Sequence, residues 1–229
     1  MFDRVQILNA RVDNLSIDEA AVAISRLSQT KLFSYTITAN VDHLIKLQED
    51  NEFRRIYESA DLVVADGVPL LWAAHFLGRP LQGRVNGTDL FELLVADAAE
   101  TKRSVFLLGG EEGAARASAA RFKQRHPGLD ISWHCPPLGF ENDAAENEKI
   151  KAAIRNAGAC YLFVGLGAPK QEKWITRHAA EAGVRHAVGV GVSFSFVAGK
   201  ILRAPGWMQR SGLEWLWRLL AEPRRLWKR

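Results

Sequence analysis

Residues 160–167 read CYLFVGLG, an apolar run that ends in two glycines one residue apart. A second such run, VFLLGG, occupies residues 105–110. Neither run alternates between apolar and polar residues, as a strand with one face in water would. Continuous apolar runs of this length are typical of strands that are buried on both faces, as in a parallel sheet covered by helices.

Working outward from these two runs, short apolar segments alternate with segments of helical periodicity. Ser16 and Glu19 form a capping box that starts a helix through residue 28, and Pro169 stands in the first turn of another helix. We expect Thr88 or Asp89 to cap the helix over 87–102. Strands are expected at 4–12, 32–40, 61–67, 104–110, 129–135, 159–167 and 185–192, and further helices at 41–59, 68–78, 111–126, 142–156 and 169–183. Repeated strand–helix units predict an α/β fold, a Rossmann-like and mostly parallel sheet with helices on both faces.

The C-terminal segment, residues 203–229, differs in composition from the rest. It holds seven basic and two acidic residues, a net charge of 7 − 2 = +5, whereas the whole chain carries +4. Four of the seven tryptophans also lie there. We therefore divide the chain into an α/β domain, 1–202, and a basic helical appendage, 203–229. The appendage has an amphipathic helical pattern formed by Leu213, Leu216, Trp217 and Leu220, which Pro223 interrupts.

Several classes of protein are disfavoured by composition. Two cysteines, Cys135 and Cys160, give no disulfide framework and fit a reducing compartment. The N-terminus lacks the apolar region of a signal peptide, and no apolar run reaches the length of a membrane span. The six histidines have no metal-ligand spacing and no Asp-x-Asp motif occurs, so we expect neither a metal ion nor another cofactor. Two glycine pairs could begin a GxGxxG motif, Gly165 with Gly167 and Gly189 with Gly191. Neither completes it, since Lys170 and Phe194 occupy the third positions, which argues against a dinucleotide site.

Polar side chains follow two of the expected strands. Thr38 and Asn40 end one of them, and Asp66 and Gly67 end another. Ligands bind at the carboxyl ends of the strands in such sheets. A carboxylate at the end of an apolar strand is partly desolvated, which makes it a better base. The alternative is that Asp66 and Asn40 simply cap the helices that follow them.

The turn that begins with Gly165 and Gly167 continues with Pro169, Lys170 and Gln171. Free backbone N–H groups, a cation and an amide donor suit an anion such as a diphosphate, although an ordinary strand–helix turn would look the same. By contrast, the acidic residues after Gly110 would repel a phosphate, so we interpret that turn as structural. Arg84 lies on a glycine-rich loop and suits a phosphate or carboxylate, or solvent alone.

Taken together, the chain resembles the WecG/TagA/CpsF glycosyltransferase family. The resemblance is carried, in family order, by TAN (38–40), ADLVVADGVPLLWAAHFLGRPLQGRVNGTDLF (60–91), VFLLGG (105–110), VGLGAPKQEKW (164–174), GVGVSFSFVAGKILRAP (189–205) and EWLWRLLAEPRRLWKR (214–229). It implies a metal-independent, inverting transferase at the cytoplasmic face of the membrane. Such an enzyme moves a sugar of the N-acetylmannosamine, N-acetylmannosaminuronic acid or glucose type from a UDP-sugar to a polyprenyl-diphosphate-linked saccharide.

The resemblance also implies roles for individual residues. The base of the family falls on Asp66 and its neighbouring threonine on Thr38. The loop arginine falls on Arg84 and the glutamine near the donor diphosphate on Gln171. The C-terminal arginines fall on Arg218 and Arg225, with Arg224 and Lys228 as weaker matches. This chain has Ser195 where family members commonly have a donor-facing aspartate, which leaves the donor sugar open.

The appendage admits three interpretations. It could be a helix docked on the domain, a nucleic-acid-binding segment, or a helix on a membrane surface. We favour an anionic membrane surface, because tryptophan suits the bilayer interface and arginine suits anionic headgroups. Nucleic acid is disfavoured because the rest of the chain has no extended basic groove.

For the whole chain, a transferase is the leading hypothesis. The alternatives are a non-catalytic nucleotide-sugar-binding scaffold in a polysaccharide assembly machine and a nicotinamide oxidoreductase. The missing dinucleotide motif disfavours the oxidoreductase, and the presence of Asp66 and Thr38 argues against the scaffold. Nothing in the sequence decides between a monomer and a homo-oligomer.

Overall fold

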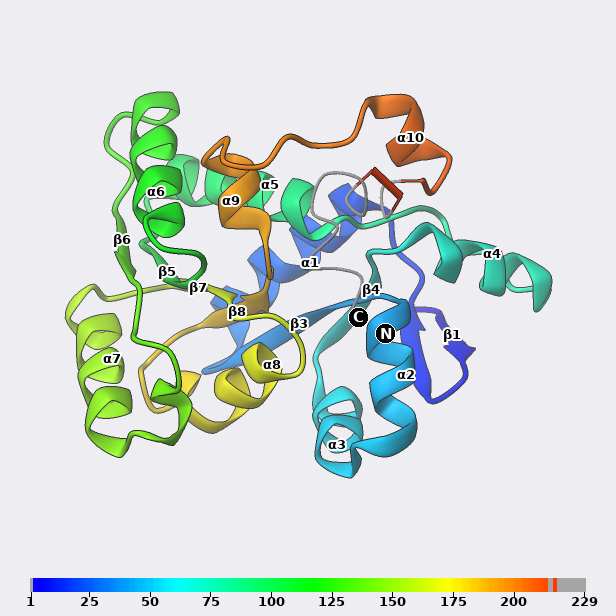
Figure 1. Cartoon of the computed structure of the whole chain (residues 1–229), viewed down its shortest axis with the longest axis horizontal. Coiled ribbons are helices and arrows are strands. Elements are labelled where there is room, and N and C mark those ends of the chain that lie inside the picture. The colour runs from blue at the N-terminus through cyan, green and yellow to red at the C-terminus, as the bar shows by residue number, and fades with distance from the viewer. Residues whose placement is uncertain (1, 214–215, 218–229) are drawn as a thin grey trace.

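The computed structural model describes residues 2–213, 216 and 217. Its centre is a six-stranded parallel sheet of order β4-β3-β8-β7-β5-β6, with a separate two-stranded antiparallel hairpin, β1-β2, at one side (Figure 1). The strands are β1 (Arg4–Ile7), β2 (Ala10–Asp13), β3 (Ser34–Ala39), β4 (Leu62–Ala65), β5 (Val105–Gly109), β6 (Ile131–His134), β7 (Tyr161–Gly165) and β8 (His186–Gly189).

Helices cover both faces of the sheet, and each layer has its own apolar core. One layer contains α2 (Val41–Glu49), α3 (Asn51–Ser59), α4 (Val68–Phe76), η1 (Phe140–Asn142), α7 (Ala144–Asn156), α8 (Lys170–Trp174) and the π-helical turn η2 (Ile175–Ala179). The other contains α1 (Ile17–Thr30), α5 (Gly87–Thr101), α6 (Ala114–Arg125) and α9 (Ser193–Val197). The predicted parallel sheet with helices on both faces is therefore confirmed.

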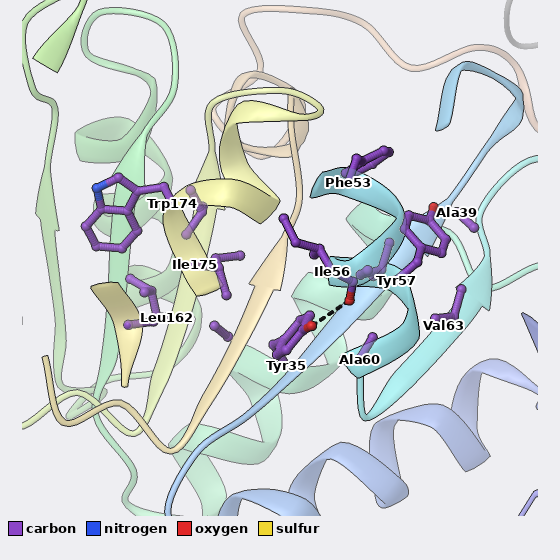
Figure 2. Packing of buried hydrophobic residues seen from close by; sticks show 14 of the residues in the cluster. Tyr35, Ala39, Phe53, Ile56, Tyr57, Ala60, Val63, Leu162, Trp174 and Ile175 are labelled. Atoms are coloured by element: carbon purple, nitrogen blue, oxygen red, sulfur yellow. Dashed lines mark hydrogen bonds between the residues drawn. The ribbon is translucent and has the colours of Figure 1, made fainter. Parts of the chain in front are cut away.

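The two apolar runs that predicted the fold are β5 and β7, neighbours in the centre of the sheet. All five residues of β5 are buried, as are the first four of β7. Their register pairs Gly109 with Gly165, which brings the two glycine turns side by side. In the first helical layer, Figure 2 shows Phe53, Ile56 and Tyr57 on α3, with Ile56 beside Tyr35 of the sheet, whose hydroxyl donates to the carbonyl of Ile56.

Three local predictions need correction. Residues 4–13 form a hairpin rather than one strand, because Leu8 turns the chain with a φ of 51°. The helix expected over 41–59 is broken at Asp50, which ends α2 and whose side chain caps α3. Asn86, rather than Thr88 or Asp89, caps α5. A short helix, α10 (Gly206–Arg210), lies in the appendage, ahead of the helical pattern that begins at Leu213.

The described part of the appendage returns to the domain. The indole N–H of Trp217 donates to the carbonyl of Leu202 at 3.2 Å, and a Cβ placed on Gly212 would lie 3.0 Å from Val68 of α4. Across residues 2–213, 216 and 217, the structure contains no helix with the length and apolar character needed to cross a membrane. The division at residue 202 stays a prediction.

Candidate active site

A cavity of about 860 Å³ opens at the carboxyl ends of the central strands. That volume falls within the range of sites that hold nucleotide-sized ligands. It is lined by residues from the segments that follow β3, β4, β5, β6, β7 and β8. Seven of the sequence-predicted residues meet in its wall: Thr38, Asn40, Asp66, Gly165, Gly167, Gln171 and Ser195.

Asp66 follows β4 and turns its carboxylate toward the start of α5. Its Oδ1 accepts from Nδ2 of Asn86 at 3.0 Å and from the backbone N–H of Gly87 at 3.2 Å. Nη2 of Arg84 lies 3.7 Å from the same oxygen, and Nε of Arg84 donates to the backbone carbonyl of Asp66 at 2.5 Å. The side chain of Asp66 is 26% exposed, so the carboxylate is held by donors yet reachable from the cavity. It does not act as a cap of α4, whose N-cap is Gly67.

Thr38 stands on the neighbouring strand, beside Asp66. Its hydroxyl donates to the carbonyl of Gly189 at 3.1 Å. A Cβ placed on Gly87 would lie 3.6 Å from Oγ1 of Thr38 and 3.8 Å from Oδ2 of Asp66. The hydroxyl and the second carboxylate oxygen therefore border the same small space, which a glycine at position 87 leaves open.

Gln171 ties two turns of the cavity wall together. Its Oε1 accepts from the backbone N–H groups of Gly167 and Gly191, each at 3.1 Å, and its Nε2 donates to Oε1 of Glu172 at 2.8 Å. A Cβ on Gly189 would lie 2.5 Å from Nε2, so only glycine fits at the end of β8. The side chain of Gln171 is buried and sets the spacing between the turns after β7 and β8.

Glu172 lies directly behind this amide and is completely buried. Burial raises the pKa of its carboxyl group to about 7. Its Oε2 has no hydrogen-bond partner among the described residues. The pKa of the nearby Tyr57 is also raised, first by burial and then by the charge of Glu172. A buried carboxyl group that takes up a proton near neutral pH therefore lies behind Gln171, which lines the cavity.

Two of the predicted site residues, Lys170 and Gly67, do not line the cavity, and Asn40 has a second role as a helix cap. Nζ of Lys170 pairs with Oε1 of Glu141 at 2.6 Å, and Lys170 does not line the cavity. Oδ1 of Asn40 accepts from the N–H of His43, so Asn40 caps α2 while lining the cavity, as the alternative interpretation expected. Gly67 lies behind Asp66 as the N-cap of α4.

Sequence reasoning missed an acidic part of the wall. Glu111 and Glu112, in the turn after β5, line the cavity, and Oγ of Ser195 donates to Oε2 of Glu111 at 3.1 Å. The turn was interpreted as structural because carboxylates repel phosphate. Carboxylates do accept from sugar hydroxyls, however, and its position at a strand end was the signal that could have identified it.

No group of three or more His, Cys, Asp or Glu side chains with metal-binding geometry occurs in the described portion of the chain. Arg218, Arg224 and Arg225 lie outside the described residues, so their predicted roles stay predictions. The first arginine of the appendage is described. Nη1 of Arg203 contacts Oδ1 of Asp89 at 2.5 Å and its Nη2 contacts Oδ2 at 3.3 Å, in the first turn of α5.

Comparison with known proteins identifies the family of this chain. The family model described as "Glycosyl transferase WecG/TagA/CpsF family" matches residues 5–229. The chain belongs to this family. It is a glycosyltransferase, and the predicted resemblance is confirmed.

Two relatives carry the same printed name, N-acetylglucosaminyldiphosphoundecaprenol N-acetyl-beta-D-mannosaminyltransferase. The protein from Bacillus spizizenii is 32% identical over 197 residues, which cover 86% of this chain and 74% of the relative. The protein from Staphylococcus aureus strain MRSA252 is 29% identical over 230 residues, which cover 99% of this chain and 86% of the relative.

Proposed function

We propose that this family member transfers an N-acetylmannosamine-type sugar from a UDP-sugar to a saccharide linked to polyprenyl diphosphate. The single observation that carries this proposal is the pairing of Asp66 and Thr38 at the wall of a nucleotide-sized cavity. The names of the two relatives support the choice of donor sugar and of acceptor, since both names specify a mannosaminyl group and a diphosphoundecaprenol-linked N-acetylglucosamine.

In the proposed reaction, Asp66 removes the proton from an acceptor hydroxyl. The resulting oxygen attacks the anomeric carbon of the donor from the face opposite the diphosphate, and the bond to UDP breaks. The configuration at that carbon therefore inverts. The carboxylate can act as a base because the donors on Oδ1 hold it in place and it remains accessible. Thr38 positions the acceptor hydroxyl beside it.

The departing UDP carries negative charge that must be stabilised. We propose that Arg218 and Arg225, with Arg224, supply the balancing positive charge in place of a metal ion, through bidentate bonds to the diphosphate. The turn that contains Gly165 and Gly167 would bring backbone close to the donor, and Gln171 would hold this turn at a fixed distance from the turn after β8. Lys170 would contribute only if it left Glu141.

The hydroxyl groups of the donor have a fitting partner in the acidic wall. Oγ of Ser195 and the carboxylate of Glu111 form one hydrogen-bonded unit at the cavity. The carboxylate accepts from sugar or ribose hydroxyls and the serine hydroxyl can both accept and donate, whereas the charge of the carboxylate repels a phosphate. We therefore place this pair beside the sugar or ribose and away from the diphosphate.

The membrane is the proposed second partner, because a polyprenyl-linked acceptor must be reached from a bilayer. Support comes from α4, which begins two residues after Asp66 and contains no Asp, Glu, Lys or Arg. Its residues Trp72 and Phe76 are 58% and 92% exposed, and Leu77 after it is 55% exposed. Aromatic side chains beside a basic appendage are typical of a peripheral membrane surface. We place the enzyme on the cytoplasmic face of the membrane.

Membrane binding is tested by sedimentation with vesicles that contain anionic lipid. Trp72→Ser with Phe76→Ser should weaken binding, whereas Val22→Ser with Leu32→Ser, which removes apolar surface elsewhere on the molecule, should not. Equal binding by both double variants would show that α4 does not contact the bilayer.

The reaction itself is tested with purified full-length protein, a short-chain polyprenyl-diphosphate N-acetylglucosamine and a set of UDP-sugars. We expect UDP release and a disaccharide product with UDP-N-acetylmannosamine, and no release without the acceptor. Release with none of the UDP-sugars, while UDP still binds, would contradict the proposed function and favour a non-catalytic binding protein.

A further inference from the structure

Asn86 is the residue that joins the start of α5 to the carboxylate of Asp66. The residue is 8% exposed, and its side chain makes four hydrogen bonds, one of them to Arg203. Oδ1 accepts from the backbone N–H groups of Thr88 and Asp89 at 2.9 and 3.2 Å, and Nδ2 donates to Oδ1 of Asp66 at 3.0 Å. One amide therefore caps a helix with its oxygen and holds a carboxylate with its nitrogen.

The capping bonds fix which way the amide points. Rotating the amide of Asn86 by 180° would place its NH₂ group against two backbone N–H donors and its oxygen against the carboxylate of Asp66. Both arrangements are repulsive, so the helix N-terminus forces Nδ2 toward Asp66. The orientation of Asp66 is therefore determined by the same residue that starts α5.

Charged groups around Asp66 come from several elements. Arg84 from the loop before α5 lies 3.7 Å from its Oδ1. In the first turn of α5, the charge of Asp89 is paired with Arg203, whose Nη2 also lies 3.5 Å from Oδ1 of Asn86. On α2, Asp42 and His43 line the same cavity. His43 is neutral, because burial lowers its pKa to about 4.

We propose that Asn86 is a positioning residue for glycosyl transfer. Asn86 turns the second oxygen of Asp66 toward the acceptor and stabilises the ionised carboxylate. This inference rests on the proposed role of Asp66 as the base. The N–H of Gly87 donates to the same oxygen, so two donors from one helix start act on Oδ1 and leave Oδ2 beside Thr38. A hydrogen bond to the charged form lowers the pKa of a carboxyl group.

The experiment separates capping from positioning with substitutions that keep the helix cap and change only the group that faces Asp66. Serine and aspartate cap helices about as well as asparagine, so Asn86→Ser and Asn86→Asp should both keep α5. Asn86→Ser removes the donor to Asp66, and Asn86→Asp replaces it by a second negative charge. We expect the acid limb of the pH profile of kcat/KM to move to higher pH, by roughly one unit for serine and further for aspartate.

A direct measurement does not depend on turnover. The pKa of Asp66 can be followed by ¹³C NMR of the labelled carboxyl group in the wild-type protein and in Asn86→Ser, and it should be higher in the variant. The control is Asp143→Ser, which exchanges the cap of α7, where Asp143 accepts from the N–H groups of Ala145 and Glu146. This control should leave both the pKa of Asp66 and the pH profile unchanged.

The outcomes are distinct. If Asn86→Ser shifts only the melting temperature and leaves the NMR titration and the pH profile as in the wild type, Asn86 is a cap alone and the inference is overturned. If Asn86→Ser does not fold, Asn86→Asp decides in the same way. Full turnover by Asp66→Asn would instead refute the role of Asp66 as the base, on which this inference rests, and that is a separate result.

Discussion

Replacing Glu172 by glutamine should change how the stability of the protein depends on pH. The carboxyl group of Glu172 is completely buried, and its pKa rises from 4.5 to about 7 because burial penalises the charged form. A group whose pKa is raised by folding holds its proton more tightly in the folded state. Its contribution to stability is complete below pH 4.5 and is lost as the pH rises through 7.

The magnitude follows from the size of the shift. A difference of about 2.5 units at about 1.4 kcal/mol per unit corresponds to roughly 3 kcal/mol. Glutamine does not titrate, so the variant lacks this loss. The free energy of unfolding of Glu172→Gln minus that of the wild type should therefore rise by roughly 3 kcal/mol between pH 4.5 and pH 8.

The assay is urea unfolding followed by circular dichroism at pH 5, 6, 7 and 8. The difference between variant and wild type is needed because two buried histidines change the free energy of unfolding with pH in the sense opposite to Glu172. Burial lowers the pKa of His43 to about 4 and that of His186 to about 3, so both contribute stability at high pH that is lost in acid. Both proteins share those terms. Parallel curves for the two proteins would refute the conclusion that Glu172 is protonated in the folded state near neutral pH.

Three further predictions concern the reaction. Turnover should be unchanged, within about twofold, in excess EDTA, and a loss that Mg²⁺ or Mn²⁺ restores would contradict stabilisation of the leaving group by arginine. Arg218→Ala and Arg225→Ala should each lower kcat by roughly 10²–10³-fold on a water-soluble acceptor, as loss of an electrostatic stabiliser does; normal kcat would assign the appendage to anchoring alone. Gln171→Leu should destabilise the fold by about 1–3 kcal/mol, because the N–H groups of Gly167 and Gly191 lose their acceptor, and it should raise KM for the donor; an unchanged KM with the stability loss would make Gln171 purely structural.

The central sheet could be predicted from the sequence because its signal is local and strong. Strands β5 and β7 are continuous apolar runs, and each buried strand is followed by a helical pattern. The hairpin at residues 4–13 could not be predicted in this way. Its turn depends on Leu8 adopting a positive φ, which leucine rarely does, so nothing in the composition marks the position.

Much of the cavity wall was predictable for a similar reason, since Thr38 lies near the end of an apolar strand and Asp66 and Gln171 follow apolar strands. What joins these residues was not predictable. Asn86 lies 20 positions from Asp66, and only the packing of α5 beside β4 brings its amide to the carboxylate. Glu111 was not predicted as a site residue, because only its repulsion of a phosphate was considered and not its ability to accept hydrogen bonds from hydroxyl groups.

The central claim is that Asp66 is the base of the transferase, and one comparison tests it most directly. Initial rates of UDP release with lipid-diphosphate acceptor are measured for the wild type and for Asp66→Asn, alongside calorimetric binding of UDP. Asparagine keeps the shape of the side chain but cannot take up the proton. We predict that turnover falls by roughly 10²–10⁴-fold while the affinity for UDP and the unfolding midpoint stay close to wild type. Near-normal turnover in Asp66→Asn would contradict the assignment of the base.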